Sequence, residues 1–268
     1  MNIKTVFSLL CLSIFFQTNA QNSIVNDTID IPKGSFITTD NLENLFVITP
    51  TNDLIKYDKD GNKLATANFK VLGNISSVDA SNPFEIYVFY RDQNRIVFLD
   101  NLLNLRGECD MESIGVSQIA CIARSFDNQI WLFDAADQKL KKYSKDLKLI
   151  SESAPWNTLT IQNSINPIQI KDISNAVLIL NNNQVLEFDI FANFSRIKLS
   201  DTLQNFQFVG NKIVFFKNGK AYAYQPQSFT LKSLDIILPE KCKGFRLEKE
   251  RLYILEDEYV ILQTFSEK

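Results

Sequence analysis

Six pairs of short apolar runs recur along the 268-residue chain. Each pair begins with an apolar triplet, and a second apolar run follows that usually closes on Asp or another polar residue. The middle residues of the six triplets are Phe46, Tyr87, Trp131, Leu178, Val214 and Tyr253. They are separated by 41, 44, 47, 36 and 39 residues, which is the length of one four-stranded propeller blade. We therefore expect an all-β fold, a six-bladed β-propeller.

The segments within each repeat have the composition of strands and tight turns. They are rich in Phe, Tyr, Ile and Val, alternate between apolar and polar residues, and are separated by Asn, Asp and Gly. Two segments predict hairpin turns, 58–62 (DKDGN) and 217–220 (KNGK), because Asn and Gly accept a positive φ. The expected blades span residues 34–68, 75–110, 118–153, 168–199, 205–236 and 244–265.

The last repeat is one strand short, because only three strands fit before the chain ends at Lys268. Residues 24–31 (IVNDTIDI) have a strand-like pattern but no blade of their own. We expect this N-terminal strand to complete the last blade as its outer strand. Such pairing closes the ring and covers edges that would otherwise favour aggregation.

The first 20 residues have the pattern of a secretory signal peptide. Lys4 precedes an apolar stretch over residues 6–16, and Thr18-Asn19-Ala20 supplies the small residues of a cleavage site. The stretch is too short to span a bilayer; a buried first helix is the alternative. Cys11 lies inside the apolar stretch, so no covalent lipid anchor is expected. The expected organisation is a signal peptide at 1–20, cleaved near Ala20, and one propeller domain at 21–268, periplasmic or secreted, with no membrane span.

The charge balance excludes binding to nucleic acid through phosphate neutralisation. Without Lys4 the chain carries 27 basic and 31 acidic side chains, and no stripe of Lys and Arg with interleaved aromatic residues appears. The chain also contains no histidine, which excludes Ser-His-Asp and Cys-His catalysis and histidine metal sites. We expect no cofactor, with a divalent cation as the one alternative. A protein-binding role is favoured over a catalytic role.

Acidic residues gather in the predicted loops between the second and third strands of the blades. In a propeller these loops share one face around the central channel. Carboxylates there are ligands suited to a divalent cation, although they are equally the residues that cap strands in solvated turns. The candidate metal ligands are Asp53, Asp134, Asp137, Glu256, Asp257 and Glu258.

Two segments are candidates for contact with a protein partner. The longest connection between blades, residues 151–167, contains Trp156, and Trp is a frequent anchor at protein interfaces. The alternative is that Trp156 folds back over the junction of blades three and four. Tyr90, Arg91 and Asp92 form the second candidate cluster, an amphipathic ring beside a guanidinium.

Three cysteines remain after residue 20, and an odd number argues against a framework of disulfides. Cys109 and Cys121 bracket a connection between two blades and are a candidate disulfide, worth about 3 kcal/mol by loop closure. The alternative is that Cys109, Cys121 and Cys242 are small apolar residues at blade edges.

The repeat resembles known propeller families. The clearest copies are residues 44–64 (NLFVITPTNDLIKYDKDGNKL) and 128–143 (NQIWLFDAADQKLKKY), which are similar to NHL and TolB-like six-bladed propellers. Blades four and five lack the Asp-rich turn of that pattern. The composition and export signal resemble those of proteins from Bacteroidota, and the size and form look like the periplasmic subunit that plugs the type IX secretion translocon.

Together, the export pattern, the propeller repeat and the absence of histidine favour an exported, non-enzymatic propeller that acts as a protein-interaction subunit of a cell-envelope or secretion complex. Two alternatives remain open at this point. One is a metal-dependent hydrolase or lactonase with carboxylates at the channel mouth, and the other is a carbohydrate-binding propeller.

Overall fold

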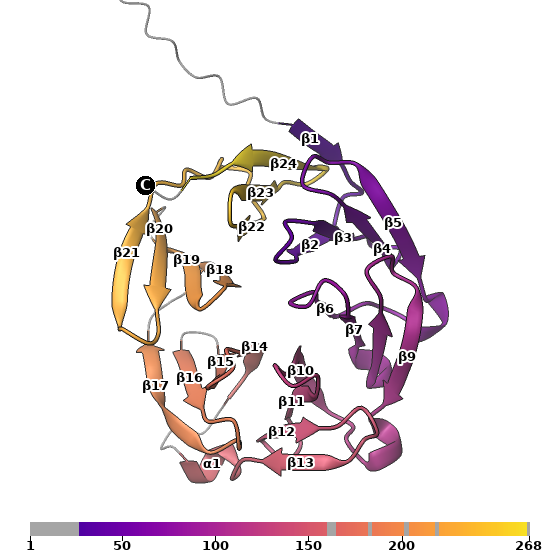
Figure 1. Ribbon diagram of the computed structural model, residues 1–268, viewed down its shortest axis with the longest axis vertical. Helices are drawn as coiled ribbons and strands as arrows, with labels where there is room; N and C mark the ends of the chain where they lie inside the picture. Colours follow the sequence, from indigo (N-terminus) through magenta and orange to yellow (C-terminus); the bar gives the residue numbers. More distant parts are fainter. Residues whose placement is uncertain (1–26, 160–164, 182–183, 201–203, 218–219, 267–268) are drawn as a thin grey trace, which may run out of the picture.

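Six antiparallel sheets of four strands each are arranged around a common axis (Figure 1). The computed structural model describes residues 27–159, 165–181, 184–200, 204–217 and 220–266. Each sheet is one blade, and its first strand lies nearest the axis. The expected six-bladed β-propeller is therefore confirmed. The predicted signal peptide lies outside the described residues.

The strands of the first three blades follow the chain in order. Blade one contains β2 (Phe36–Thr39), β3 (Leu45–Ile48), β4 (Asp53–Tyr57) and β5 (Lys63–Asn68). Blade two contains β6 (Ser77–Asp79), β7 (Ile86–Tyr90), β8 (Arg95–Leu99) and β9 (Leu105–Asp110). Blade three contains β10 (Ile119–Arg124), β11 (Ile130–Asp134), β12 (Lys139–Tyr143) and β13 (Leu149–Glu152).

The other blades repeat this order, except that the last one takes its outer strand from the start of the chain. Blade four contains β14 (Pro167–Asp172), β15 (Val177–Asn181), β16 (Gln184–Phe188) and β17 (Phe194–Ser200). Blade five contains β18 (Gln204–Val209), β19 (Lys212–Lys217), β20 (Lys220–Gln225) and β21 (Thr230–Leu234). Blade six contains β22 (Gly244–Glu248), β23 (Arg251–Leu255), β24 (Tyr259–Thr264) and β1 (Asp27–Asp30).

Short helices occur only in connections of the described chain. They are η1 (Lys70–Leu72), η2 (Arg91–Gln93), η3 (Glu112–Ile114) and α1 (Trp156–Leu159). No helix among the described residues is long and apolar enough to cross a membrane.

The ring closes as the sequence predicts. β1 pairs antiparallel with β24, and Ile29 is the register partner of Val260. Ile29 and Ile31 are buried in one cluster with Leu45 of blade one and Tyr253 of blade six. The N-terminal strand therefore joins two blades as well as completing one. Residues 24–26 of the predicted strand lie outside the described residues.

The core lies between the blades rather than at the centre of the ring. β3, β7, β11 and β15 are buried at every position. Alternate residues of a strand point to opposite faces of its sheet. Val47 of β3 therefore packs against Tyr253 of blade six, and Phe46 packs against Val88 of blade two. These second strands are apolar over most of their length because a neighbouring blade covers each face.

A repeated Asp-centred turn forms many of the hairpins. Asp40 accepts hydrogen bonds from the backbone amides of Leu42 (3.0 Å) and Asn44 (2.9 Å) and from the Asn44 side chain (2.8 Å). Asp58, Asp100 and Asp189 make the same three contacts. The residue before the Asn is left-handed in each turn; Gly61, at φ 85°, is the only glycine among the four.

The turns confirm one sequence prediction and correct another. The predicted hairpin at 58–62 is one of the Asp-centred turns. The turn at 217–220 includes residues outside the described chain, although Lys217 and Lys220 are register partners. Blade four was expected to lack the Asp-rich turn, but Asp189 forms it. The sequence pattern concealed it because Phe191 and Ala192 occupy the positions of Asp60 and Gly61 in the Asp58 turn.

Antiparallel order gives the ring two different faces. Turns after the first and third strands of every blade lie at one end of its sheet, which we call face A. Loops after the second strands, together with the connections between blades, lie at the other end, which we call face B.

Candidate functional site

The central channel contains a pocket of about 240 Å³ that is lined by residues from the first strand of every blade, β2, β6, β10, β14, β18 and β22. Asn41, Ser81 and Gly210, which follow first strands, also line it. The pocket therefore lies toward face A, at the end of the channel opposite to the loops that carry the acidic residues singled out by sequence. Its charged lining residues are Asp79, Lys171, Arg246 and Glu248, and Gln207 is a polar lining residue.

β22 presents Arg246 and Glu248 to the pocket because of its strand alternation. Phe245 and Leu247 point the other way, into the core between blades five and six. Arg246 Nη1 donates to the backbone carbonyl of Phe245 at 2.9 Å. Glu248 Oε1 accepts from Thr39 Oγ1 at 2.6 Å. Arg246 and Glu248 are thus fixed two residues apart on one wall.

Burial perturbs both of these charged groups. It raises the pKa of Glu248 to about 7, although the hydrogen bond from Thr39 and the charge of Lys171 act in the opposite direction. Burial also lowers the pKa of Arg246 to about 10, with the charge of Glu248 opposing the shift. Glu248 therefore changes its charge near neutral pH, whereas Arg246 stays charged there.

Side chains that bridge neighbouring blades hold the pocket wall in place. Gln207 donates through Nε2 to the backbone carbonyl of Leu247 (2.8 Å), and its Oε1 accepts from the Leu247 amide (2.6 Å). Asp79 accepts from the backbone amides of Ser81 (2.9 Å) and Arg124 (2.8 Å). These hydrogen bonds link the inner strands of blades five and six and those of blades two and three.

The acidic residues of face B do not converge on one point. Asp53 belongs to blade one, Asp134 and Asp137 to blade three, and residues 256–258 to blade six. Among the described residues, no group of three or more Asp, Glu, Cys or His side chains is placed to hold a metal ion. The proposed set of metal ligands is therefore distributed around the ring.

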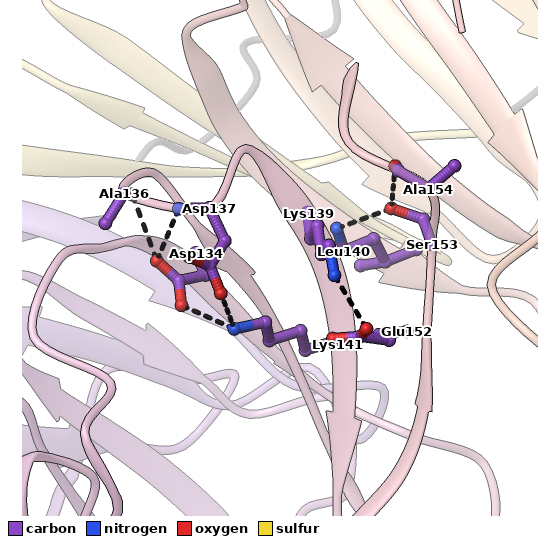
Figure 2. A network of polar contacts seen from close by, with 9 residues as sticks. All are labelled: Asp134, Ala136, Asp137, Lys139, Leu140, Lys141, Glu152, Ser153 and Ala154. Atoms are coloured by element: carbon purple, nitrogen blue, oxygen red, sulfur yellow. Dashed lines mark hydrogen bonds and ion pairs between the residues drawn. The ribbon is translucent and has the colours of Figure 1, made fainter. Parts of the chain in front are cut away.

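Local partners already engage most of these carboxylates. Figure 2 shows Lys141 Nζ between Asp134, at 2.8 Å, and Asp137. Burial opposes the charge of Lys141, but the two hydrogen bonds raise its pKa above the usual value. Asp134 and Lys141 are both buried. This pair is consequently a structural ion pair of blade three.

The remaining acids are held in turns or lie in solvent. Asp53 accepts from Thr51 Oγ1 (2.7 Å) and from Asn68 Nδ2 (2.6 Å), and these bonds lower its pKa. Glu256 is buried and accepts from Tyr259 Oη at 2.6 Å. Asp257 and Glu258 are exposed, and Asp257 lies 3.8 Å from Lys243. Asp53 and Glu256 therefore fit the alternative that these acids cap strands in turns and bind no metal.

Tyr90 and Trp156, the aromatic residues expected to contact a partner, lie in the interior and not on the surface. Tyr90 is fully buried, and its hydroxyl has no hydrogen-bond partner among the described residues. Trp156 is 1% exposed and meets Phe194 edge-on at a centroid distance of 5.7 Å. It packs in one cluster with Trp131 of blade three and Phe188 of blade four. Trp156 therefore folds back over the junction of these blades, the alternative that the sequence left open.

In the candidate cluster of Tyr90, Arg91 and Asp92, the side chains of Arg91 and Asp92 reach solvent. Arg91 Nη2 donates to the backbone carbonyl of Ala120 at 2.7 Å, across the junction of blades two and three. The two residues lie on face B, in the η2 loop. Neither residue lines the central pocket.

The candidate disulfide is not formed. Cys109 and Cys121 are free thiols, and Cys109 Sγ donates to the backbone carbonyl of Lys145. Cys109 belongs to β9, an outer strand, and Cys121 to β10, an inner strand. A connection between blades runs from the rim to the channel, so its two ends lie far apart radially. Cys242 is also free, in agreement with the reading of three small apolar residues.

Sequence reasoning missed the pocket residues, although a signal for them was present. In the segment 244–248 (GFRLE), Arg246 and Glu248 alternate with Phe245 and Leu247. Charged residues on the polar face of a first strand must point into the channel, because the first strand is the innermost one. The sequence favours loop residues as candidates because binding and catalytic residues are concentrated on loops.

Comparison with known proteins shows the fold alone. No model of a known protein family and no curated protein matches the sequence. The structure is similar to virginiamycin B lyase from Staphylococcus aureus with quinupristin, with a TM-score of 0.62 and 12% identity over 90% of this chain and 99% of that one. It is also similar to the Pan2 WD40 domain from Neurospora crassa, with a TM-score of 0.62 and 8% identity over 90% and 95%. YCF48 bound to D1 peptide gives a TM-score of 0.54 and 10% identity over 90% and 97%.

Proposed function

We propose that this chain is an exported, non-enzymatic propeller that binds a protein partner in a cell-envelope or secretion complex, and that face A is the docking surface. The observation that carries this proposal is a set of large apolar side chains in the turns of face A. They are Leu42 (52% exposed), Phe84 (68%), Leu102 (60%), Phe126 (49%) and Phe191 (66%).

The position of these residues is what makes them informative. All five follow a first or a third strand, so one end of the ring collects them from blades one to four. Single exposed apolar residues are ordinary, whereas a contiguous apolar patch marks an interaction surface, and we infer that these turns at one end of the ring form such a patch. Aromatic side chains are also enriched in protein interfaces. A partner that presents apolar side chains fits this face.

Two further observations support a binding role over a catalytic one. YCF48 has a comparable fold and was solved with a peptide bound, so a propeller of this size accommodates a protein segment. A variant of the similar virginiamycin B lyase is described as catalytically inactive after a histidine was replaced by alanine. This sequence contains no histidine and therefore lacks that residue type altogether.

We infer the cellular location of the proposed complex from the sequence pattern. Residues 1–20 have the pattern of a signal peptide with cleavage near Ala20, which favours a periplasmic or secreted protein without a covalent lipid anchor. The narrower form of the proposal is a plug subunit of a type IX translocon in Bacteroidota. It is supported by the size, the export pattern and the propeller form.

A site-specific crosslinking experiment tests the docking face. A photoreactive residue replaces Phe84 on face A or, as the control, Val71, which is 91% exposed in the η1 connection on face B. Illumination of cells that express each variant should link one specific envelope protein at position 84 and not at position 71. Mass spectrometry of the adduct identifies the partner and shows whether it belongs to a secretion translocon.

A second arm measures the apolar contribution. The double variant Phe84→Ser, Phe126→Ser should lose the co-purifying partner, whereas Val71→Ser should retain it. Both side chains are exposed at their positions, so the melting temperature should stay close to that of the parent protein. Equal retention in all variants, or crosslinks at position 71 alone, would refute docking through face A.

A further inference from the structure

The central pocket contains two cationic side chains that form no ion pair within 4.0 Å with a described residue. Within the described chain, Arg246 makes one side-chain hydrogen bond, to the carbonyl of Phe245, and no ion pair. Lys171 lines the same pocket from β14 and has no hydrogen bond or ion pair through its ammonium group with a described residue. By contrast, the buried Lys141 of blade three is held by two carboxylates. Because no carboxylate lies within ion-pair distance of Arg246 or Lys171 among the described residues, most of their N–H donors are available to a ligand.

Glu248 is the nearest acid by sequence, but it does not act as a fixed counterion for Arg246. Its Oε1 accepts from Thr39 and from Gln207, the latter at 3.3 Å. Its Oε2 has no hydrogen bond with a described residue, so this oxygen is available to a ligand. A carboxyl group with one free oxygen accepts a hydroxyl hydrogen when ionised and donates one when protonated.

The pocket also limits the size and charge of what it can hold. Its volume of about 240 Å³ corresponds to roughly eight water molecules at about 30 Å³ each, which suits a ligand with a single ring. Asp79 adds a negative charge on the wall, and backbone amides already occupy both of its oxygens. Below pH 7 Glu248 is mostly neutral, so Arg246, Lys171 and Asp79 give the pocket wall a net charge of +1, which matches a monoanion.

We propose that the central pocket binds a small hydroxylated monocarboxylate of single-ring size, such as an acidic sugar. Arg246 and Lys171 hold its carboxylate, and Glu248 Oε2 forms a hydrogen bond with one of its hydroxyl groups. Arg suits the first role because its planar guanidinium matches a carboxylate through paired hydrogen bonds. None of the proposed docking residues lines this pocket, so ligand binding and the proposed protein contact are tested by separate experiments.

Isothermal titration calorimetry at pH 6 provides the test, with D-glucuronate as the probe and D-glucose as the neutral probe of the same size. We expect saturable binding of glucuronate and at least tenfold weaker binding of glucose. Absence of binding by glucuronate at millimolar concentration, or equal binding of both sugars, would overturn the proposal. Tighter binding of inorganic phosphate than of glucuronate would overturn the assignment of a monocarboxylate.

Variants identify the pocket as the place of binding. Arg246→Gln should weaken glucuronate binding at least tenfold, and Lys171→Gln should weaken it severalfold. The matched control is Arg106→Gln, which removes an exposed arginine of blade two that pairs with Asp100 and should leave binding unchanged. If Arg246→Gln lowers the melting temperature below the working range, Lys171→Gln alone decides. Unchanged affinity in the folded pocket variants would refute the site.

The pH dependence gives an independent readout. The groups that face Glu248 are Arg246 on its own strand, Lys171 on β14, Asp40 beyond β2 and Asp79 on β6. Ionisation of Glu248 places a negative charge beside the bound carboxylate. The neutral fraction of a group with a pKa near 7 falls roughly tenfold between pH 6 and pH 8. Glucuronate should therefore bind up to roughly tenfold more weakly at pH 8 than at pH 6. The variant Glu248→Gln should lose this dependence; if it kept the full dependence, the role of Glu248 would be refuted.

Discussion

Ile29 and Val260 are register partners across the seam of the ring, although one lies near the start of the described chain and the other near its end. The pairing places a strand from the N-terminus on the outer edge of blade six. Ile29 also contributes to the cluster between blades six and one. The seam therefore depends on packing between blades as much as on the hydrogen bonds of β1.

Substitution in the closing strand should destabilise the whole ring. Ile29→Ala removes a side chain that is 8% exposed and should cost about 2–4 kcal/mol of unfolding free energy, because a cavity remains in the cluster. For a domain of this size we expect the melting temperature to fall by about 5–10 °C. Deletion of residues 21–32 should lower it further. Thermal unfolding followed by circular dichroism measures both effects.

A matched control separates packing from strand pairing. Thr28→Ala lies on the same strand, but its side chain is exposed. It should change the melting temperature by less than about 2 °C, because exposed substitutions are usually within about 0.5 kcal/mol. A deletion of residues 21–32 that leaves the melting curve unchanged would contradict the closure seen in Figure 1.

The two carboxylates around Lys141 should differ sharply in their contribution to stability. Asp134→Asn leaves the buried ammonium of Lys141 without its buried partner and should cost about 3 kcal/mol. Asp137→Asn should cost less than about 1 kcal/mol, because that carboxylate is 52% exposed and solvent screens it. Urea denaturation of both variants compares the two. Equal costs would show that burial does not control this network.

Glu248 should make stability depend on pH. The folded state raises its pKa to about 7, whereas the ordinary value is 4.5. Between these two values the folded protein binds more protons than the unfolded chain, so the free energy of unfolding falls as the pH rises from 4.5 to 7. Glu248→Gln removes this loss and should stabilise the protein by roughly 1–3 kcal/mol at pH 8.

The comparison needs urea denaturation of both proteins at pH 5 and pH 8. The difference between wild type and Glu248→Gln isolates this group, since the other titrating residues are shared. The variant should gain most at pH 8 and little at pH 5. A larger gain at pH 5 than at pH 8 would contradict the raised pKa.

The thiols of Cys109 and Cys121 should react slowly in the native protein. Burial raises the pKa of Cys109 to about 11 and that of Cys121 to about 12, so the reactive thiolate is scarce at pH 8. Iodoacetamide should modify both only after denaturation, and the mass of the intact protein should be the same with and without reductant. A mass gain of two hydrogens on reduction would indicate a disulfide that this structure does not contain.

Much of the fold was predictable because a blade is a repeated sequence unit. The triplets around Phe46 and Tyr87 are apolar at every position, as expected for strands covered on both faces. The same property concealed the role of Tyr90. It ends such a strand, and its neighbours in sequence do not show that the adjoining blade covers its ring.

The site was less predictable because it depends on the radial position of each strand. The length of its loop predicts a surface position for Trp156, yet the loop folds back and buries the indole between blades three and four. Asp134 is a candidate metal ligand by sequence, whereas in the structure it pairs with Lys141 of the partner strand in the same hairpin. Arg246 and Glu248 belong to an inner strand, and their importance appears only when six such strands are placed around one axis.

The antiparallel pairing of β1 with β24 also has a topological consequence. Asp27 is the register partner of Leu262, so the start of β1 lies beside the end of β24, as in an ordinary hairpin. A short peptide linker between these two positions would make the backbone a continuous circle. New chain ends could then be opened between any two blades, and a circular permutant would present its termini at a different point on the ring while retaining all six sheets.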